Sequence, residues 1–235
     1  MLRPALVFLS VSALLGPAAI ASDVLSPSPP VLAHYPLQTD GVDATGNYGP
    51  MTLTNTSFQD GGVYCNGIYP GGDPEACVVQ TPSIEALDFE SFAISAEFKI
   101  DEYPTVHPYR PVFMGGPSWR WMGADVYPDS TIGLRYNSAS FGVRSDVEVS
   151  LDTWHQVIIT YDGSVDTGRL YLDEQLVIEE TFVIEHGDER EIATHNASSG
   201  QAFLGLFREL VIFGATYDPT PTDGTTWGAI KASFR

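Results

Sequence analysis

Two tryptophans flank an arginine in Trp119-Arg120-Trp121, and residues of these types bind sugars in many proteins. On an extended strand the two indoles would lie on one face, about 6.5 Å apart. Aromatic rings stack on the C–H groups of sugars, and a guanidinium bonds to hydroxyl or carboxylate groups. Tyr127 and Tyr136 follow nearby, so we predict a carbohydrate-binding surface from these residues. The alternative is that the tryptophans pack in the core, with Arg120 facing outward.

A second group of residues has the chemistry of a calcium site. Asp40, Asp43 and Asn47 lie within one short loop, and Asp218 follows the last strand that we expect. Calcium takes about six to eight oxygen ligands, which carboxylates, amides and backbone carbonyls supply. We therefore predict a Ca²⁺ site from these four residues and no other cofactor. The alternative is that the acidic residues form Asx turns.

The only two cysteines, Cys65 and Cys77, enclose a loop rich in glycine and proline. An isolated pair in an exported chain most simply forms a disulfide. Closing a loop of this length would stabilise the fold by about 2–3 kcal/mol. A metal site at this pair is not expected, because no matching Cys or His pair is nearby.

The first residues have the pattern of an export signal. A single positive charge at Arg3 precedes the apolar residues 5–15, and Ala19-Ile20-Ala21 is a small-residue cleavage site. We predict a signal peptide over 1–21 and a Ser/Pro-rich linker over 22–30. The protein is then secreted and extracellular, or periplasmic or on the cell surface in a bacterium. No later segment is apolar and long enough to predict membrane insertion.

The net charge narrows the range of partners. Asp and Glu number 30 against 11 Lys and Arg, which gives a formal net charge of -19. Such a surface repels nucleic acid and anionic lipid, so we expect neither as a partner.

The elements that must position these groups are strands. Residues 154–161 read as a strand with His155, Val157, Ile159 and Tyr161 on one face, a polar turn follows, and Leu170-Tyr171-Leu172 begins a return strand. Along residues 93–100 apolar and polar side chains alternate, with Ile94, Ala96, Phe98 and Ile100 on one face. Many short strands separated by Gly and Pro predict an all-β, two-sheet antiparallel jelly-roll sandwich that forms one domain over 31–235.

The stretch from Trp154-His155-Gln156-Val157 to Asp162-Gly163, with Arg169 to Asp173 after it, resembles the central hairpin of laminin-G-like and pentraxin-like domains. These domains belong to the concanavalin A-like lectin/glucanase superfamily. The resemblance covers nearly all of the predicted domain and implies a concanavalin A-like sandwich that often binds calcium. These domains often have His at the position of His155, which implies a structural role for it. In these domains the closing strand often begins with an acidic pair. At that place this chain has Arg208-Glu209, so one of the expected acids is a cation.

The same superfamily includes enzymes, so we searched for their motifs. Its glucanases use a Glu-x-Asp step, and no such step occurs in the chain. The nearest acidic groups, Glu85/Asp88/Glu90 and Asp146/Glu148, have the wrong spacing or the wrong motif. Its polysaccharide lyases use a Gln-x-His step, which His155-Gln156 is not. Ser-His-Asp and Cys-His sites have no recognisable spacing either, so we predict no catalytic residues.

The sequence therefore predicts a secreted, non-catalytic module that binds a carbohydrate or another extracellular polymer, assisted by calcium. Two alternatives remain open. One is a divergent glycoside hydrolase or polysaccharide lyase of the same fold. The other is an adhesion domain that binds an extracellular protein.

Overall fold

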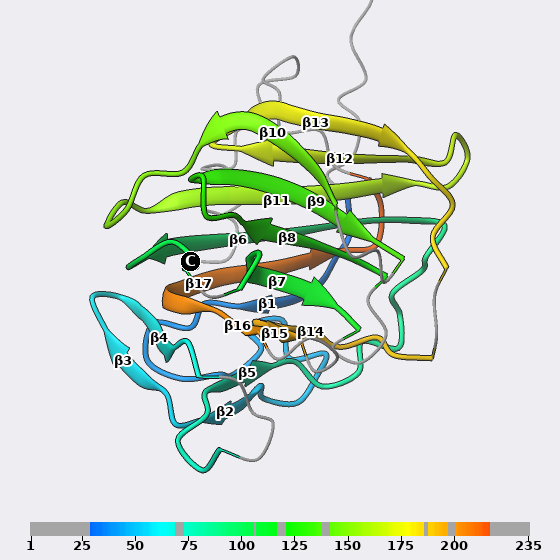
Figure 1. Cartoon of the computed structure of the whole chain (residues 1–235). Coiled ribbons are helices and arrows are strands. Elements are labelled where there is room, and N and C mark those ends of the chain that lie inside the picture. Colours follow the sequence, from blue (N-terminus) through cyan, green and yellow to red (C-terminus); the bar gives the residue numbers. More distant parts are fainter. Residues whose placement is uncertain are drawn as a thin grey trace, which may run out of the picture.

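The chain folds as a sandwich of two antiparallel sheets, which confirms the predicted fold class (Figure 1). The computed structural model describes residues 29–68, 73–105, 107–116, 121–137, 142–185, 188–196 and 201–216. Across these residues every regular element is a strand, and no helix is long and apolar enough to cross a membrane. The predicted signal peptide and most of the predicted linker lie outside the described residues, so these assignments stay predictions.

The first sheet has the strand order β13-β12-β11-β6-β17-β4-β3. Strand β1 lies outside this linear order and also pairs with β17. Its strands are β1 (Val31–Tyr35), β3 (Ser57–Gln59), β4 (Gly62–Asn66), β6 (Ser91–Ile100), β11 (His155–Asp162), β12 (Thr167–Leu172), β13 (Gln175–Thr181) and β17 (Leu204–Phe213). The predicted central hairpin is β11–β12, paired from Val157–Leu172 to Asp162–Thr167.

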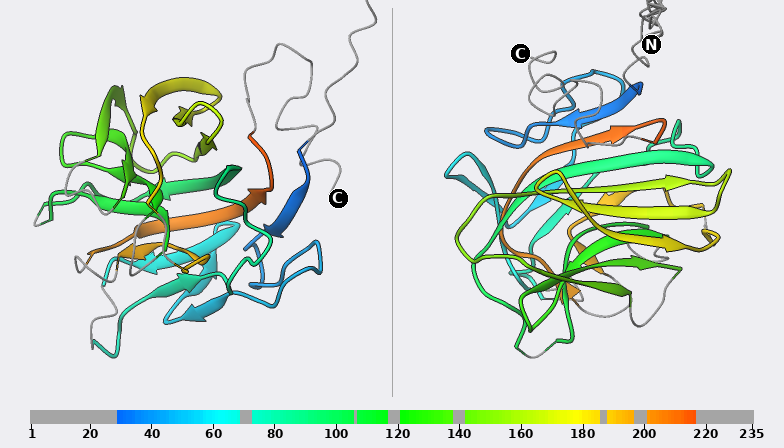
Figure 2. Two further views of the ribbon diagram at one scale, coloured as in Figure 1. Left: turned by 90° about the vertical axis from the view of Figure 1, so that its right-hand side faces the viewer. Right: turned by 90° about the horizontal axis from the view of Figure 1, so that it is seen from above.

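The second sheet has the order β10-β9-β8-β7-β14-β5-β2 and lies over the first, as the turned views show (Figure 2). Its strands are β2 (Thr52–Thr54), β5 (Val78–Gln80), β7 (Arg110–Gly115), β8 (Met122–Val126), β9 (Thr131–Tyr136), β10 (Val143–Glu148) and β14 (Ile192–Ala193). A separate two-stranded ribbon pairs β15 (His195–Asn196) with β16 (Gln201–Ala202).

The core lies between the sheets, and β6 shows how the sequence builds it. Ile94, Ala96 and Phe98 point inward and are fully buried, as their alternation predicts. The outward side chains of β6 are also shielded from solvent, since Glu97 is only 9% exposed. A second apolar cluster lies on this outer face: Ala93, Ile158, Tyr171, Val211 and Phe213. Both faces of the first sheet therefore exclude water around β6 and β11.

The outer face of the second sheet holds a buried ion pair. Asp125 and Arg135 alternate with core residues of β8 and β9, so they point away from the core, yet Arg135 is 1% exposed. The Arg135 Nε donates to Asp125 Oδ2. The guanidinium carbon lies 3.6 Å from the centre of the Tyr109 ring. This arrangement satisfies both charges at a site where either one alone would be costly.

We expect Arg135→Ala to lower the free energy of unfolding by about 3–5 kcal/mol, because it leaves the Asp125 carboxylate buried without its partner. Urea denaturation followed by tryptophan fluorescence measures the change. The double variant Asp125→Leu/Arg135→Met removes both charges and should recover most of the loss. A double variant as unstable as the single one would show that the pair itself is not the stabilising contact.

Candidate functional site

A depression of about 310 Å³ opens on the outer face of the first sheet, where β11 begins. Its wall is built from three neighbouring strands and the β12–β13 turn. Arg208, Glu97 and Gln156 pair in register across β17, β6 and β11, so they form one row of side chains. The residues that line the depression are Glu97, Trp154, His155, Gln156, Asp173, Glu174 and Arg208.

Trp154 forms the aromatic wall of the depression. The guanidinium carbon of Arg208 lies 3.8 Å from the centre of the indole, and Arg208 Nε donates to Glu97 Oε2 at 2.6 Å. The ring also lies over Gly62, where an added Cβ would come within 2.9 Å of it. Contacts with the guanidinium and with Gly62 therefore fix the orientation of the indole.

Gln156 forms part of the same wall and is the least satisfied polar group in it. The residue is 9% exposed, and Nε2 has no hydrogen-bond partner. A buried donor without a partner costs about 1–3 kcal/mol. Unpaired buried groups in native proteins call for an explanation, and a role in binding a polar ligand would supply one.

The β12–β13 turn brings two more carboxylates to the depression. Asp173 and Glu174 have φ values of 49° and 67°, as a two-residue hairpin turn of this kind requires. This left-handed conformation costs a residue with a Cβ roughly 1–2 kcal/mol. Glycine or asparagine would fit the turn with less strain, so the strained Glu174 places a carboxylate here at the expense of stability.

Asp173 is fixed by two hydrogen bonds. Its Oδ1 accepts the Gln156 N–H at 2.8 Å, and its Oδ2 lies 2.7 Å from Nδ1 of His155. Burial by itself would raise the pKa of Asp173, but these hydrogen bonds outweigh burial and hold the pKa below its ordinary value. Asp173 therefore stays ionised at neutral pH.

His155 links Asp173 to Ser150 in a chain of contacts with the connectivity of a Ser-His-Asp triad, although the spacing gave no sign of one. The Ser150 N–H lies 3.2 Å from Nε2 of His155, and the Ser150 carbonyl oxygen lies 3.3 Å from the same nitrogen. The Ser150 hydroxyl lies 2.9 Å from the same Nε2. These contacts tie the imidazole to Ser150, so the ring closes the loop between Ser150 and His155. The geometry thus agrees with the structural role that the family resemblance implied for His155.

The predicted aromatic surface is wrong at Trp121. This residue is fully buried, with its ring 5.2 Å edge-to-face from both Phe89 and Phe92. Its Nε1 donates to the Glu189 carbonyl at 3.1 Å. The ring fills the space beside Gly115, where a Cβ would lie 2.0 Å from it. The core alternative is therefore correct for Trp121, whereas Trp119 and Arg120 lie outside the described residues.

Tyr127 and Tyr136 do not share a sugar-binding surface with Trp121. Tyr127 is 1% exposed and lies against Gly133, with the guanidinium carbon of Arg144 3.8 Å from its ring centre. Tyr136 stacks on Phe182 with ring centres 3.7 Å apart. Their rings are thus used in packing, since residues near in sequence occupy different faces of the second sheet.

The predicted calcium loop is organised around Asp43 through hydrogen bonds. Its Oδ1 accepts the N–H groups of His34 and Thr45, and its Oδ2 accepts the N–H groups of Asn47 and Tyr48 and the Thr45 hydroxyl, all within 3.0 Å. Burial alone would raise the pKa of Asp43, but these bonds hold it below its ordinary value. This is the Asx-turn alternative, and it leaves little of the carboxylate for a metal.

The other predicted calcium ligands are also engaged or undescribed. Asp40 Oδ1 accepts the Val42 N–H at 3.0 Å, and the Asn47 amide donates to the Leu32 carbonyl at 2.9 Å. Asp218 lies outside the described residues. No group of three or more His, Cys, Asp or Glu side chains suited to a metal occurs in the part of the chain that the structure describes. Calcium binding stays a prediction.

Cys65 and Cys77 are neighbours, but in this structure they are two free, buried thiols instead of the predicted disulfide. A hydrogen bond with Cys77 and burial together raise the pKa of the Cys65 thiol well above its ordinary value. The structure therefore brings the predicted partners together, and the covalent bond between them stays a prediction.

Part of the depression belongs to the hairpin that the sequence predicts. Trp154, Gln156 and Asp173 belong to the hairpin motif, although we assigned them no binding role. Glu97 and Arg208 come from strands far away in the sequence, so the motif alone could not reveal them. The available signal was the outward position of Glu97 on a strand whose other face is apolar.

Comparisons with known proteins agree with the fold. A laminin-G family model, described as the concanavalin A-like lectin/glucanases superfamily, matches residues 73–220. A search of curated protein sequences finds no match.

Several solved structures share the architecture. Domain 4 of AbnA, an extracellular arabinanase from Geobacillus stearothermophilus solved with arabinotriose, has a TM-score of 0.64 at 20% identity, covering 83% of this chain and 98% of its own. The Trypanosoma rangeli sialidase with the inhibitor DANA has a TM-score of 0.63 at 14% identity, covering 79% of this chain and 30% of its own. A botulinum neurotoxin type C structure, titled for its interaction with two ganglioside molecules, has a TM-score of 0.60 at 11% identity, covering 87% and 51%. At these identities the likeness establishes the fold alone.

We expect Asp43→Ala to lower the free energy of unfolding by about 2–3 kcal/mol at neutral pH, equally in calcium and in chelator, because the carboxylate binds backbone groups. Asp40→Ala, which removes one exposed bond, is the control and should cost under about 1 kcal/mol. Since the folded-state pKa of Asp43 is lowered, its contribution is complete above the ordinary aspartate pKa and is lost as the pH falls through the lowered value. Denaturation curves between neutral and acidic pH measure this. A loss of stability for Asp43→Ala only in calcium would instead identify a metal ligand.

We expect protein recovered from an oxidising medium to carry a Cys65–Cys77 disulfide, because the two sulfurs already lie in contact. Alkylation of the denatured protein followed by mass spectrometry should find no free thiol before reduction and two after it. Cys77→Ser should leave one free thiol and lower stability by about 2–3 kcal/mol. Two reactive thiols in the unreduced secreted protein would show that the dithiol is the natural state.

Proposed function

This chain belongs to the concanavalin A-like lectin/glucanase superfamily, and on that premise we propose that it is a secreted, non-catalytic module that binds a glycan in the depression beside Trp154. The observation that carries the proposal is the Gln156 amide, a buried donor without a partner on the wall of that depression. A ligand rich in hydroxyl groups would supply the acceptor that it lacks.

The other groups of the depression suit the same ligand. Sugars combine apolar C–H faces with many hydroxyl groups, so they bind where an aromatic ring adjoins charged and amide side chains. Trp154 supplies the ring, while Glu97 and Asp173 supply acceptors for hydroxyl donors. Contacts with Arg208 and His155 already orient these side chains, which reduces the entropy lost on binding.

The solved structures of this fold add support by analogy. The arabinanase domain was solved with arabinotriose, and the neurotoxin is titled for its interaction with gangliosides. Secretion rests on the export pattern of residues 1–21, and the appearance of a mature protein that begins at Ser22 would test it.

A non-catalytic role is supported by the state of the carboxylates. A glycosidase acid needs a raised pKa beside a second carboxylate. Here the pKa of Asp173 is lowered, and Glu97 is held by the Arg208 guanidinium. Asp173 therefore favours the ionised form, which accepts hydrogen bonds but has no proton to give to a leaving group, and the Glu97 carboxylate is occupied by an ion pair.

We expect Trp154→Ala to weaken glycan binding at least tenfold, because it removes the stacking surface of the depression. Binding would be found on a glycan array and quantified by calorimetry with the mature protein, with and without chelator. Because Trp154 also packs on Gly62, a second variant keeps the test independent of folding. Gln156→Met removes the unpaired amide at nearly constant volume, so it should weaken binding while leaving the melting temperature unchanged or higher.

The matched control is Tyr127→Leu, which alters an aromatic residue on the second sheet. Its expected affinity is that of the unaltered protein. Binding that survives both depression variants but is lost with Tyr127→Leu would move the site to the second sheet. A failure to bind any glycan, together with capture of an extracellular protein, would favour the adhesion alternative. Release of reducing ends from a bound polysaccharide would favour the enzyme alternative.

A further inference from the structure

The depression has a charge pattern that selects among glycans. Three carboxylates line it, those of Glu97, Asp173 and Glu174, against the single guanidinium of Arg208. Ionised carboxylates only accept hydrogen bonds, so this wall requires a ligand that donates them.

The one cation of the depression is already committed to the protein. Arg208 Nε donates to Glu97, and the flat face of the guanidinium covers Trp154. An acidic sugar would therefore meet three carboxylates and a single guanidinium that already forms an ion pair with one of them.

The backbone strain at Glu174 also supports a site that selects for positive charge. A glutamate there adopts a left-handed backbone conformation that glycine would take at lower cost. The Glu174 side chain is exposed and lines the depression, where it places a negative charge beside the position of a ligand. Gln156 is the independent observation that a ligand belongs here, since its amide is buried and lacks a partner on the same wall.

We infer that the depression selects a glycan whose sugars carry protonated amino groups, over neutral sugars and still more over sugars with acid groups. This inference rests on the proposed function. An ammonium on the sugar would donate charge-assisted hydrogen bonds to the carboxylates, and these are stronger than the bonds made by a hydroxyl. The remaining hydroxyl groups would pair with the Gln156 amide, and the ring face would stack on Trp154.

Calorimetry with three oligosaccharides of equal length tests this inference: a glucosamine oligomer, its N-acetylated form and a galacturonic acid oligomer. The pH is set where carboxyl groups are ionised and the sugar amine is protonated. We expect the amine oligomer to bind at least threefold more tightly than the acetylated one, and the acidic oligomer not to bind. Trp154→Ala should weaken the binding of the amine oligomer and of the acetylated oligomer.

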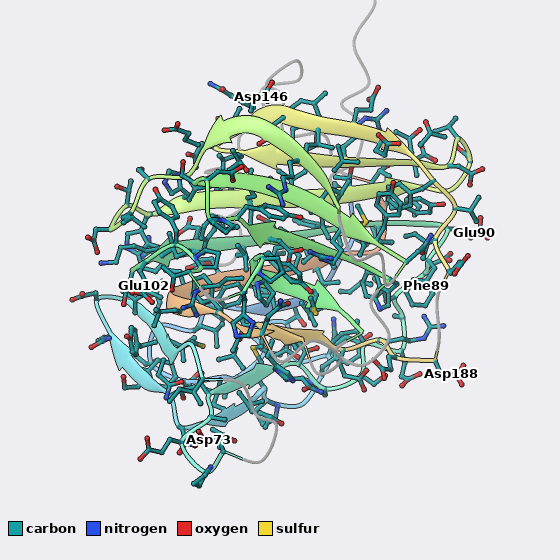
Figure 3. The ribbon with its side chains drawn as sticks, in the orientation of Figure 1. Asp73, Phe89, Glu90, Glu102, Asp146 and Asp188 are labelled. Carbon is teal, nitrogen blue, oxygen red and sulfur yellow. The ribbon has the colours of Figure 1, made fainter. Side chains whose placement is uncertain are left out.

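The net charge of -19 attracts any cationic sugar. A matched pair of variants therefore distinguishes attraction by the depression from attraction by the charge of the whole surface. Glu174→Gln removes one charge inside the depression. Glu90→Gln makes the same change at the other end of β11, where Gly163 N–H donates to the Glu90 carbonyl, about 20 Å away by strand rise. In Figure 3 Glu90 lies at the edge of the molecule. Glu174→Gln should abolish most of the preference for the amine, and Glu90→Gln should leave it intact.

Glu174→Gly guards against a folding artefact, because relief of the backbone strain should raise the melting temperature while the preference falls. If Glu90→Gln and Glu174→Gln reduce the preference for the amine oligomer equally, the inference is overturned, because the attraction would then come from the charge of the whole surface. Tighter binding of the acidic oligomer, still sensitive to Trp154→Ala, would overturn it and leave the proposed function intact. If none of the oligomers and no glycan on the array binds, both proposals fail.

Discussion

Strand β6 pairs antiparallel with β11 on one side and with β17 on the other, and the pairing with β17 has an irregularity between Arg208 and Val211. This ladder satisfies the backbone polar groups at the centre of the molecule, where neither face of the sheet meets water. The inward side chains of β6 form the core between the sheets, and the outward ones pack in the second apolar cluster. A slip by one residue would move the core side chains of these strands to the outer face and carry Glu97 and Gln156 into the core.

The depression is a consequence of that register. It forms where the outward row of β17, β6 and β11 changes from apolar to polar, with Arg208, Glu97 and Gln156 side by side. The strained β12–β13 turn adds Asp173 and Glu174 at the same place. Two features here work against stability, the unpaired Gln156 amide and the left-handed Glu174. Natural proteins keep such features mainly at functional sites, which is the physical reason for proposing a ligand site here.

Aromatic residues of the second sheet and its adjoining loops pack within the protein and do not line the depression. Trp121 and Phe92 pack edge to face in the core, while Arg135 and Arg144 stack on Tyr109 and Tyr127 across the opposite face. Glycines at 115 and 133 leave the room that these rings fill. The same residue types that suggest sugar binding in a sequence thus serve packing here, and only their burial distinguishes the two roles.

Much of the fold followed from the sequence alone, because alternation of side chains and turn chemistry are local properties. The strand over 93–100, the hairpin from Trp154 to Asp173 and the two-sheet architecture are examples. The sequence also predicted that Cys65 and Cys77 are neighbours. For the acidic residues of the first loop it offered two alternatives, a calcium site and Asx turns, and the structure has the turn geometry. What it could not supply was the candidate site. Whether Trp121 faces the core depends on the space left by Gly115, and whether Glu97 meets Arg208 depends on strand pairing across more than a hundred residues. Contacts of this kind exist only after the sheets have formed, so the tertiary structure alone decided them.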